Sequence, residues 1–222
     1  MDLRSIVLAL TGATLACTGL FYGVRFMQRG NHLIGVEWLI MGISSTNATV
    51  FFLTQSPQAY DIAHFFDAFS RAFGLPIVTS AGLLVITHGY RPTAFQEILY
   101  FALSFAAAAV LVLSPALKPA LPVFYLVMWL VFTMFLMMFA LELLKHQIYL
   151  HFWLTVLAVI MSLAIAVIYD FFKIPGDETN PILNFYSIAL MTWAFLTAEI
   201  YYAYFALERV KLSRKYSRIA AS

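Results

Sequence analysis

Polar residues spaced three or four positions apart mark one face of a stretch of the chain that is otherwise apolar. They are Asp61, His64, Asp67 and Arg71, and the apolar stretch covers residues 62–87. In a helix these side chains fall within about 120° of one another. A charge near the centre of a bilayer costs about 2.5–3.5 kcal/mol on insertion scales, so it is rarely kept without a partner or a function.

Arg71 is the residue of this face whose chemistry is most specific. Its guanidinium group is planar and permanently charged, so it suits a carboxylate or a phosphate, and we expect it to receive the anionic group of a metabolite or lipid headgroup. Pro76 follows closely and predicts a kink that frees backbone carbonyl groups near the midplane. The stripe through Asp61 and His64 would then be an access path. The alternative is that Asp67 and Arg71 form a pair that only stabilises the bundle.

Polar residues in two other apolar stretches are candidates for the same site. Glu37 and Asn47 lie in the second stretch, and Glu199 lies in the last one. Residues 44–49 of the second stretch are unusually polar and predict a locally irregular or cavity-lining helix; the alternative is that their small hydroxyl side chains let helices pack closely. The predicted substrate-binding residues come from three spans and are Arg71, Asp67, His64, Glu37, Asn47 and Glu199.

The carboxyl groups of this set outnumber its arginine. Glu37, Asp67 and Glu199 face one guanidinium group, so either some are protonated or a bound cation or ligand balances them. A carboxyl group that changes protonation as its access to water changes is the basic part of a proton-coupled carrier. We therefore predict these three residues as proton-coupling groups, with a hydrogen-bonded structural role as the alternative for each.

An enzymatic role is the less favoured interpretation. Glu142, His146 and His151 lie at the boundary of the fifth and sixth apolar stretches. Zinc sites need three or four ligands at characteristic spacings, and no HExxH motif is present. We predict no metal, no cofactor and no catalytic residue. A metal-dependent intramembrane hydrolase and a non-catalytic structural or sensory subunit remain as alternatives.

Composition defines the class of protein. Of 222 residues, 63% are hydrophobic and 11% are charged, whereas soluble domains carry about 25% charged residues. Runs of about 20 apolar residues predict a polytopic, all-α bundle of seven membrane helices. The predicted spans are Ser5–Phe26, Leu33–Leu53, Ile62–Thr87, Phe95–Leu113, Pro122–Leu144, Tyr149–Phe172 and Leu183–Leu207. Residues 1–207 would form this domain, and residues 208–222 a basic cytoplasmic tail.

Lysine and arginine residues predict the orientation of the chain. One side of the predicted topology carries Arg25, Arg29, Arg91, Lys145, Arg209, Lys211, Arg214, Lys215 and Arg218. The other side carries Arg4, Lys118 and Lys173. Because lysine and arginine concentrate in cytoplasmic loops, we expect the amino terminus outside and the carboxyl terminus in the cytoplasm.

Together these patterns favour a small transporter-like protein of the plasma membrane, or of the cell inner membrane if the source is bacterial. Its expected partners are membrane lipids and an anionic small molecule or lipid headgroup, with a homo-oligomer left open and nucleic acid excluded. A role in envelope or lipid homeostasis, or in drug tolerance, would fit this chemistry. The fifth span is interpreted as scaffold. Asp170 is expected at the outer interface, with a role in closing the outer vestibule as the alternative.

Overall fold

The computed structural model describes residues 2–172, 174, 177, 180–182 and 184–220. In these residues every regular element is a helix, and seven of the helical runs are long and apolar enough to cross a membrane. The prediction of an all-α protein with seven such helices is confirmed, and it indicates an integral membrane protein. The predicted first residue of the last span, Leu183, lies outside the described residues.

The helices follow the predicted spans closely at most ends. They are α1 Leu3–Gln28, α2 His32–Thr54, α3 Pro57–Phe69, η1 Ser70–Thr79, α4 Ser80–His88, α5 Ala94–Leu113, η2 Pro115–Ala120, α6 Leu121–Lys145, α7 Tyr149–Phe171 and α8 Phe185–Ala220. The third span consists of α3, η1 and α4 in direct succession. Its start is fixed by Ser56, whose side chain accepts a hydrogen bond from the backbone of Ala59, with Pro57 at the first helical position.

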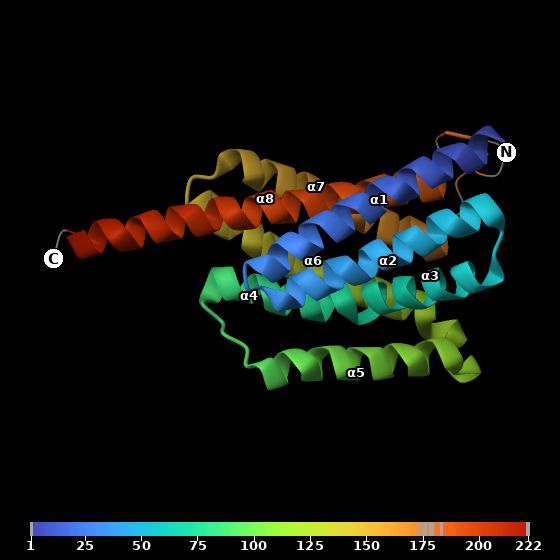
Figure 1. Ribbon diagram of the computed structural model, residues 1–222, viewed down its shortest axis with the longest axis horizontal. Helices are drawn as coiled ribbons and strands as arrows, with labels where there is room; N and C mark the ends of the chain where they lie inside the picture. The colour runs from blue at the N-terminus through green and yellow to red at the C-terminus, as the bar shows by residue number, and fades with distance from the viewer. Residues whose placement is uncertain (1, 173, 175–176, 178–179, 183, 221–222) are drawn as a thin grey trace.

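Close backbone packing joins α1 and α2 along most of their length (Figure 1). A Cβ atom at Gly19 would lie 2.8 Å from the backbone nitrogen of Gly42, and one at Gly23 would lie 2.9 Å from the backbone nitrogen of Leu39. Glycine at these positions therefore lets the two helices approach to a distance that no larger side chain permits. Ser45 adds a hydrogen bond of 2.7 Å to the carbonyl oxygen of Gly12.

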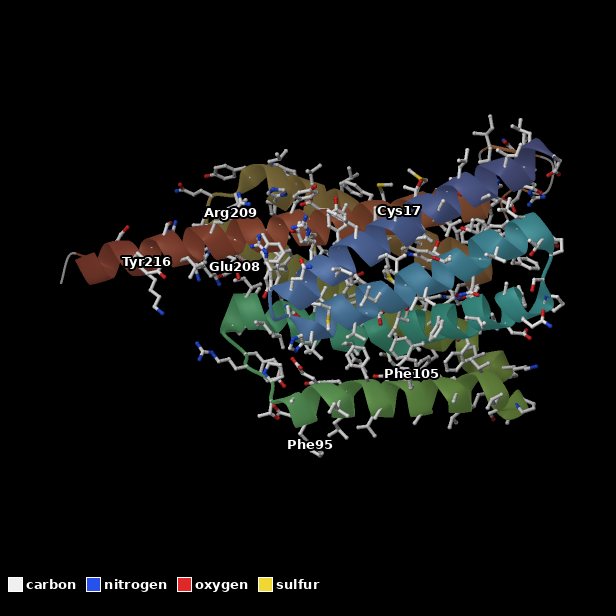
Figure 2. The ribbon with its side chains drawn as sticks, viewed as in Figure 1. Cys17, Phe95, Phe105, Glu208, Arg209 and Tyr216 are labelled. Atoms are coloured by element: carbon white, nitrogen blue, oxygen red, sulfur yellow. The ribbon has the colours of Figure 1, made fainter. Side chains whose placement is uncertain are left out.

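A large apolar core lies between α1, α2, α6, α7 and α8. Its fully buried members include Trp38, Phe132, Leu136 and Leu196. In contrast, α5 lies at the edge of the bundle (Figure 1), where its only buried residues are small ones. The ring of Phe105 stacks on that of Phe69 in α3, at 4.2 Å between centroids. Phe95, near the start of α5, points away from the protein (Figure 2).

The last helix continues well beyond the bundle. No break separates residues 1–207 from the predicted tail, because α8 runs without interruption to Ala220. Tyr216 lies on this projecting part of α8, whereas Arg209 lies at the end of the bundle (Figure 2). Lys211 anchors its base by donating hydrogen bonds to the carbonyl oxygens of Ile86 and Thr87, at 2.8 and 3.2 Å. The same ammonium group lies 2.8 Å from the carboxylate of Glu142.

Candidate functional site

A cavity of about 230 Å³ lies inside the bundle, among α1, α2, α3, η1, α6, α7 and α8. Most of its wall is apolar or aromatic, with a few polar groups among these residues. The lining residues that matter for the argument are Ser44, Ser45, Phe51, Tyr60, His64, Asp67, Ser70, Arg71, Leu75, Trp129, Tyr169, Tyr186 and Trp193. This mixture resembles that of small-molecule sites, in which a few placed polar groups fix the orientation of a largely apolar ligand.

The cavity is reached from the end of the bundle where α2 gives way to α3. Tyr60 and His64 lie in the first two turns of α3, and both are exposed while also lining the cavity. Their rings stack at 5.7 Å between centroids with an interplanar angle of 2°. Phe51, near the end of α2, covers Tyr60 at 5.1 Å. Of the two residues of the predicted access path, His64 lies on the cavity wall, whereas Asp61 is exposed and does not line the cavity.

Arg71 lies on the cavity wall with only 6% of its side chain exposed. One guanidinium nitrogen lies 3.7 Å from the Asp67 carboxylate, one turn earlier, and another donates a short hydrogen bond to the carboxylate of Asp170 in α7. The guanidinium carbon lies 4.2 Å from the ring centre of Tyr125 and 3.7 Å from that of Tyr169. Its charge is therefore balanced by two carboxylates and two aromatic faces.

The two acidic partners of Arg71 are held by different helices. Asp67 accepts a hydrogen bond of 3.2 Å from the Tyr169 hydroxyl, and Tyr169 immediately precedes Asp170 in α7. With both carboxylates ionised, Asp67, Arg71 and Asp170 carry a net charge of −1. The cluster consequently ties α3 and η1 to α7 through charge. A change in the charge or the partner of any of its three side chains therefore affects the contact between these helices.

A widened helical segment places Arg71 in this cluster. Residues Ser70–Thr79 form a π-helical run in the middle of the third span, with Pro76 inside it. Proline has no backbone N–H and its ring crowds the preceding turn, so the ordinary helical ladder cannot pass through this point. Where the sequence predicted a kink at Pro76, the structure has a π-helical run of 10 residues, a feature frequent at functional sites.

Three of the predicted site residues line the cavity together, namely His64, Asp67 and Arg71. The other three are not part of its wall. Asn47 donates a hydrogen bond of 2.9 Å to the carbonyl oxygen of Ile43 within its own helix. The polar stretch of α2 remains a regular α-helix, so the predicted irregularity is wrong, because such side chains back-bond to their own helix. Ser44 and Ser45 of that stretch do line the cavity.

Glu199 lies in a second polar cluster, between α7 and α8. Its carboxylate is 3.0 Å from Nδ1 of His151, and the hydroxyl of Thr155 donates to the same oxygen at 3.4 Å. His146 instead contacts the carboxylate of Glu142 at 3.7 Å. Within the described ranges, no group of three or more His, Cys, Asp or Glu side chains is placed to hold a metal ion.

Glu37 is fully buried in α2, where it packs against Gly74 of the π-helical run. A methyl group at Gly74 would overlap both carboxyl oxygens of Glu37, so glycine is needed there to make room for the acid. The structure thus separates the predicted residues. His64, Asp67 and Arg71 line the cavity, Glu37 is buried against Gly74 outside it, and Glu199 pairs with His151.

Sequence reasoning missed four residues of the site. Asp170 and Tyr169 of α7 hold Arg71 and Asp67, and Tyr125 and Trp129 come from α6, the span interpreted as scaffold. Charge balance was the available signal, because a buried arginine calls for acidic partners at similar depth. Aromatic residues carry no such signal, since most of those in a membrane protein face lipid or core.

We compared the chain with protein-family models, curated proteins and solved structures, and none of the three comparisons gave a match. Function must therefore be inferred from the site itself.

Proposed function

We propose that this protein is a small transporter-like membrane protein that binds an amphipathic ligand through an anionic group at Arg71. The observation that carries the proposal is a guanidinium group on the wall of a largely apolar and aromatic cavity, paired with the carboxylate of another helix. An anionic ligand would take the place of Asp170 on the guanidinium, while its apolar part would occupy the space beside Trp129 and Trp193.

Exchange of partners at Arg71 supplies a mechanism for coupling binding to movement. In the structure, the Asp170 carboxylate pairs with Arg71 and so holds α7 against η1. Displacing this carboxylate would weaken that contact and allow α7 to move relative to the third span. A ligand can shift such an equilibrium only by its difference in affinity for the two arrangements, and direct competition for one guanidinium group provides such a difference.

Charge balance favours proton coupling. The cluster of Asp67, Arg71 and Asp170 carries −1 before an anion binds, and it would carry −2 afterwards. Because like charges in a site of low dielectric disfavour ionisation, uptake of a proton by one carboxylate should accompany the ligand. The protein would then take up an anion together with a proton.

The distribution of lysine and arginine residues supports an orientation of the chain in the membrane and a location in the cell. Nine lysine and arginine residues lie on the predicted cytoplasmic side and three on the other, so the carboxyl terminus would be cytoplasmic. The opening beside Tyr60 and His64 would then face outward, since α3 begins at the outer end of its span. A plasma membrane, or a bacterial inner membrane, fits this arrangement.

Quenching of tryptophan fluorescence tests the proposal. Of the four tryptophans, Trp129 and Trp193 line the cavity, Trp38 is fully buried and Trp153 is 65% exposed, so a Trp153→Phe background removes the reporter that faces lipid. The probe is a long-chain bromoalkyl sulfonate, which stays anionic at all working pH values and whose bromine quenches indole on contact. The bromoalkyl alcohol of equal length is the neutral control.

We expect saturable quenching in which the sulfonate binds about 10- to 100-fold more tightly than the alcohol, as a hydrogen bond to a charged group contributes about 1.5–3 kcal/mol. Arg71→Gln should abolish this preference, whereas Arg209→Gln, the same charge change at an exposed residue of α8 outside the cavity, should preserve it. Short 2-bromoethanesulfonate distinguishes a free metabolite from a lipid: comparable binding would indicate a metabolite. Equal affinity for sulfonate and alcohol in the parent protein would overturn the proposal.

A structural role is the second candidate, and the complete pairing of Arg71 is the observation that favours it. Asp170→Asn separates the two candidates without relying on loss of function. This variant removes the carboxylate that competes for Arg71 and brings the cluster to neutrality. If Arg71 binds the ligand, the affinity for the sulfonate should therefore rise at least about tenfold. A purely structural Arg71 predicts no gain.

A further inference from the structure

Glu37 is an acidic residue deep in the bundle that the ligand site does not use. Its exposed fraction is 0%. The Ser70 hydroxyl lies beside its carboxyl group, but neither that hydroxyl oxygen nor the two Glu37 oxygens has a hydrogen bond of ordinary geometry to any described residue. An ionised carboxylate in such a place would carry the full penalty of an unpaired buried charge.

No described charged side chain is placed to compensate Glu37. The elements packed against α2 are α1, α3, η1 and α4, together with α5 through Leu33 and Ile40 and α8 through the indole of Trp38. Each titratable group on them that could approach has another partner or lies away from Glu37. Those groups and their contacts are Tyr22 with Tyr202, His32 with Glu97, His64 with Tyr60, Asp67 and Arg71 with each other, His88 with Thr87, Tyr90 with Tyr100, Tyr204 with Asn31, and Glu199 with His151.

Ser70 connects Glu37 to the cavity. It is the first residue of the π-helical run, it precedes Arg71 in the chain, and it lines the cavity. Its hydroxyl oxygen is itself buried, but the group can donate one hydrogen bond and accept others, so a rotation of this side chain toward the cavity would let it pass a proton between the Glu37 carboxyl group and cavity water. Gly74 leaves the space that Glu37 needs beside this hydroxyl.

We infer that Glu37 is a proton-binding site, held as a neutral carboxylic acid in this conformation and exchanging its proton with water in the cavity through Ser70. In that exchange the Glu37 O–H gives its proton to the Ser70 oxygen while the Ser70 hydroxyl proton passes to a water molecule, and a proton returning from water through Ser70 by the reverse steps restores the neutral acid. The storage of the proton stands on burial alone; its use in transport rests on the proposed function.

Infrared spectroscopy of the full-length protein in lipid nanodiscs tests the storage of the proton. A neutral carboxylic acid absorbs at a C=O frequency that carboxylates lack. We expect Glu37→Gln to remove one such band at neutral pH, while Glu208→Gln, at a half-buried carboxylate 3.6 Å from Arg29, leaves the spectrum in this region unchanged. Absence of any Glu37-dependent band would show an ionised group and overturn the inference.

Transfer into D₂O tests the connection to the cavity. The Glu37 band should shift as its proton exchanges, and Ser70→Ala should slow that shift at least about tenfold. Ser80→Ala is the matched control, because its hydroxyl is also buried and unpartnered but does not line the cavity. Equal exchange rates in the parent and Ser70→Ala proteins would exclude the Ser70 route.

The bromoalkyl sulfonate adds a readout that separates the two proposals. If it binds in the cavity, it should slow the deuterium exchange of Glu37 by blocking water. If it does not quench Trp129 and Trp193, the proposed function fails, while the Glu37 band and its dependence on Ser70 still decide the present inference.

Discussion

The pair between Arg71 and Asp170 makes a quantitative prediction about stability. Arg71→Gln would leave the Asp67 and Asp170 carboxylates close together without their cation. Breaking a buried ion pair by removing one partner costs about 3–5 kcal/mol. Because these carboxylates are 25% and 19% exposed, we expect the lower end of that range. Asp170→Asn should cost less, about 1–2 kcal/mol, since Arg71 keeps Asp67 and two aromatic faces.

A double-mutant cycle isolates the interaction from these separate costs. The free energy of unfolding would be measured in mixed micelles for the parent, each single variant and the Arg71→Gln/Asp170→Asn protein. Residues in direct contact show coupling energies of about 0.5–3 kcal/mol, and we expect at least about 1 kcal/mol here, with the double variant more stable than the sum of the single changes predicts. Additive effects would refute the pairing on which both the site and its mechanism depend.

Three further predictions concern the packing around the site. Gly19→Val should destabilise the protein by about 1–3 kcal/mol or more, because its side chain would meet the backbone of Gly42; thermal unfolding measures the loss. Lys211→Met should increase amide hydrogen exchange at the end of α4 and at the base of the α8 projection, since the last carbonyls of α4 and the Glu142 carboxylate lose their shared donor; unchanged exchange would contradict that anchoring role. Phe105→Ala should release α5, seen as faster proteolysis of the connections at its two ends while the remaining helices stay protected.

Helix number and most boundaries could be predicted from the sequence because they depend on local properties. The fourth predicted span, residues 95–113, differs from α5 by one residue, since Thr93 begins the helix with a capping box. The predicted boundaries are wrong where the helix extends beyond the apolar residues. The third span begins at Pro57 because its polar first turns are helical without being apolar. Similarly, α8 continues past Leu207, since lysine, arginine and leucine favour helix regardless of the membrane.

The site could be predicted only in part, for a related reason. His64, Asp67 and Arg71 share one face of one helix, so their spacing alone brings them together. Which other helices meet that face depends on packing, which the spacing of polar residues does not encode. Asp170 and Glu199 are both acidic residues of apolar spans, yet one pairs with Arg71 and the other with His151. That distinction comes from the rotation and depth of α7 and α8 relative to the third span.

The position of a bound anion tests the central claim most directly. Crystals of the protein grown with the long-chain bromoalkyl sulfonate would reveal the sulfonate in the electron density and the bromine by its anomalous scattering. We expect the sulfonate oxygens on the guanidinium group of Arg71, the Asp170 carboxylate displaced from it, and the bromine beside Trp129 or Trp193. Bromine found only on the lipid-facing surface, with the Arg71–Asp170 pair intact, would contradict a ligand site at Arg71.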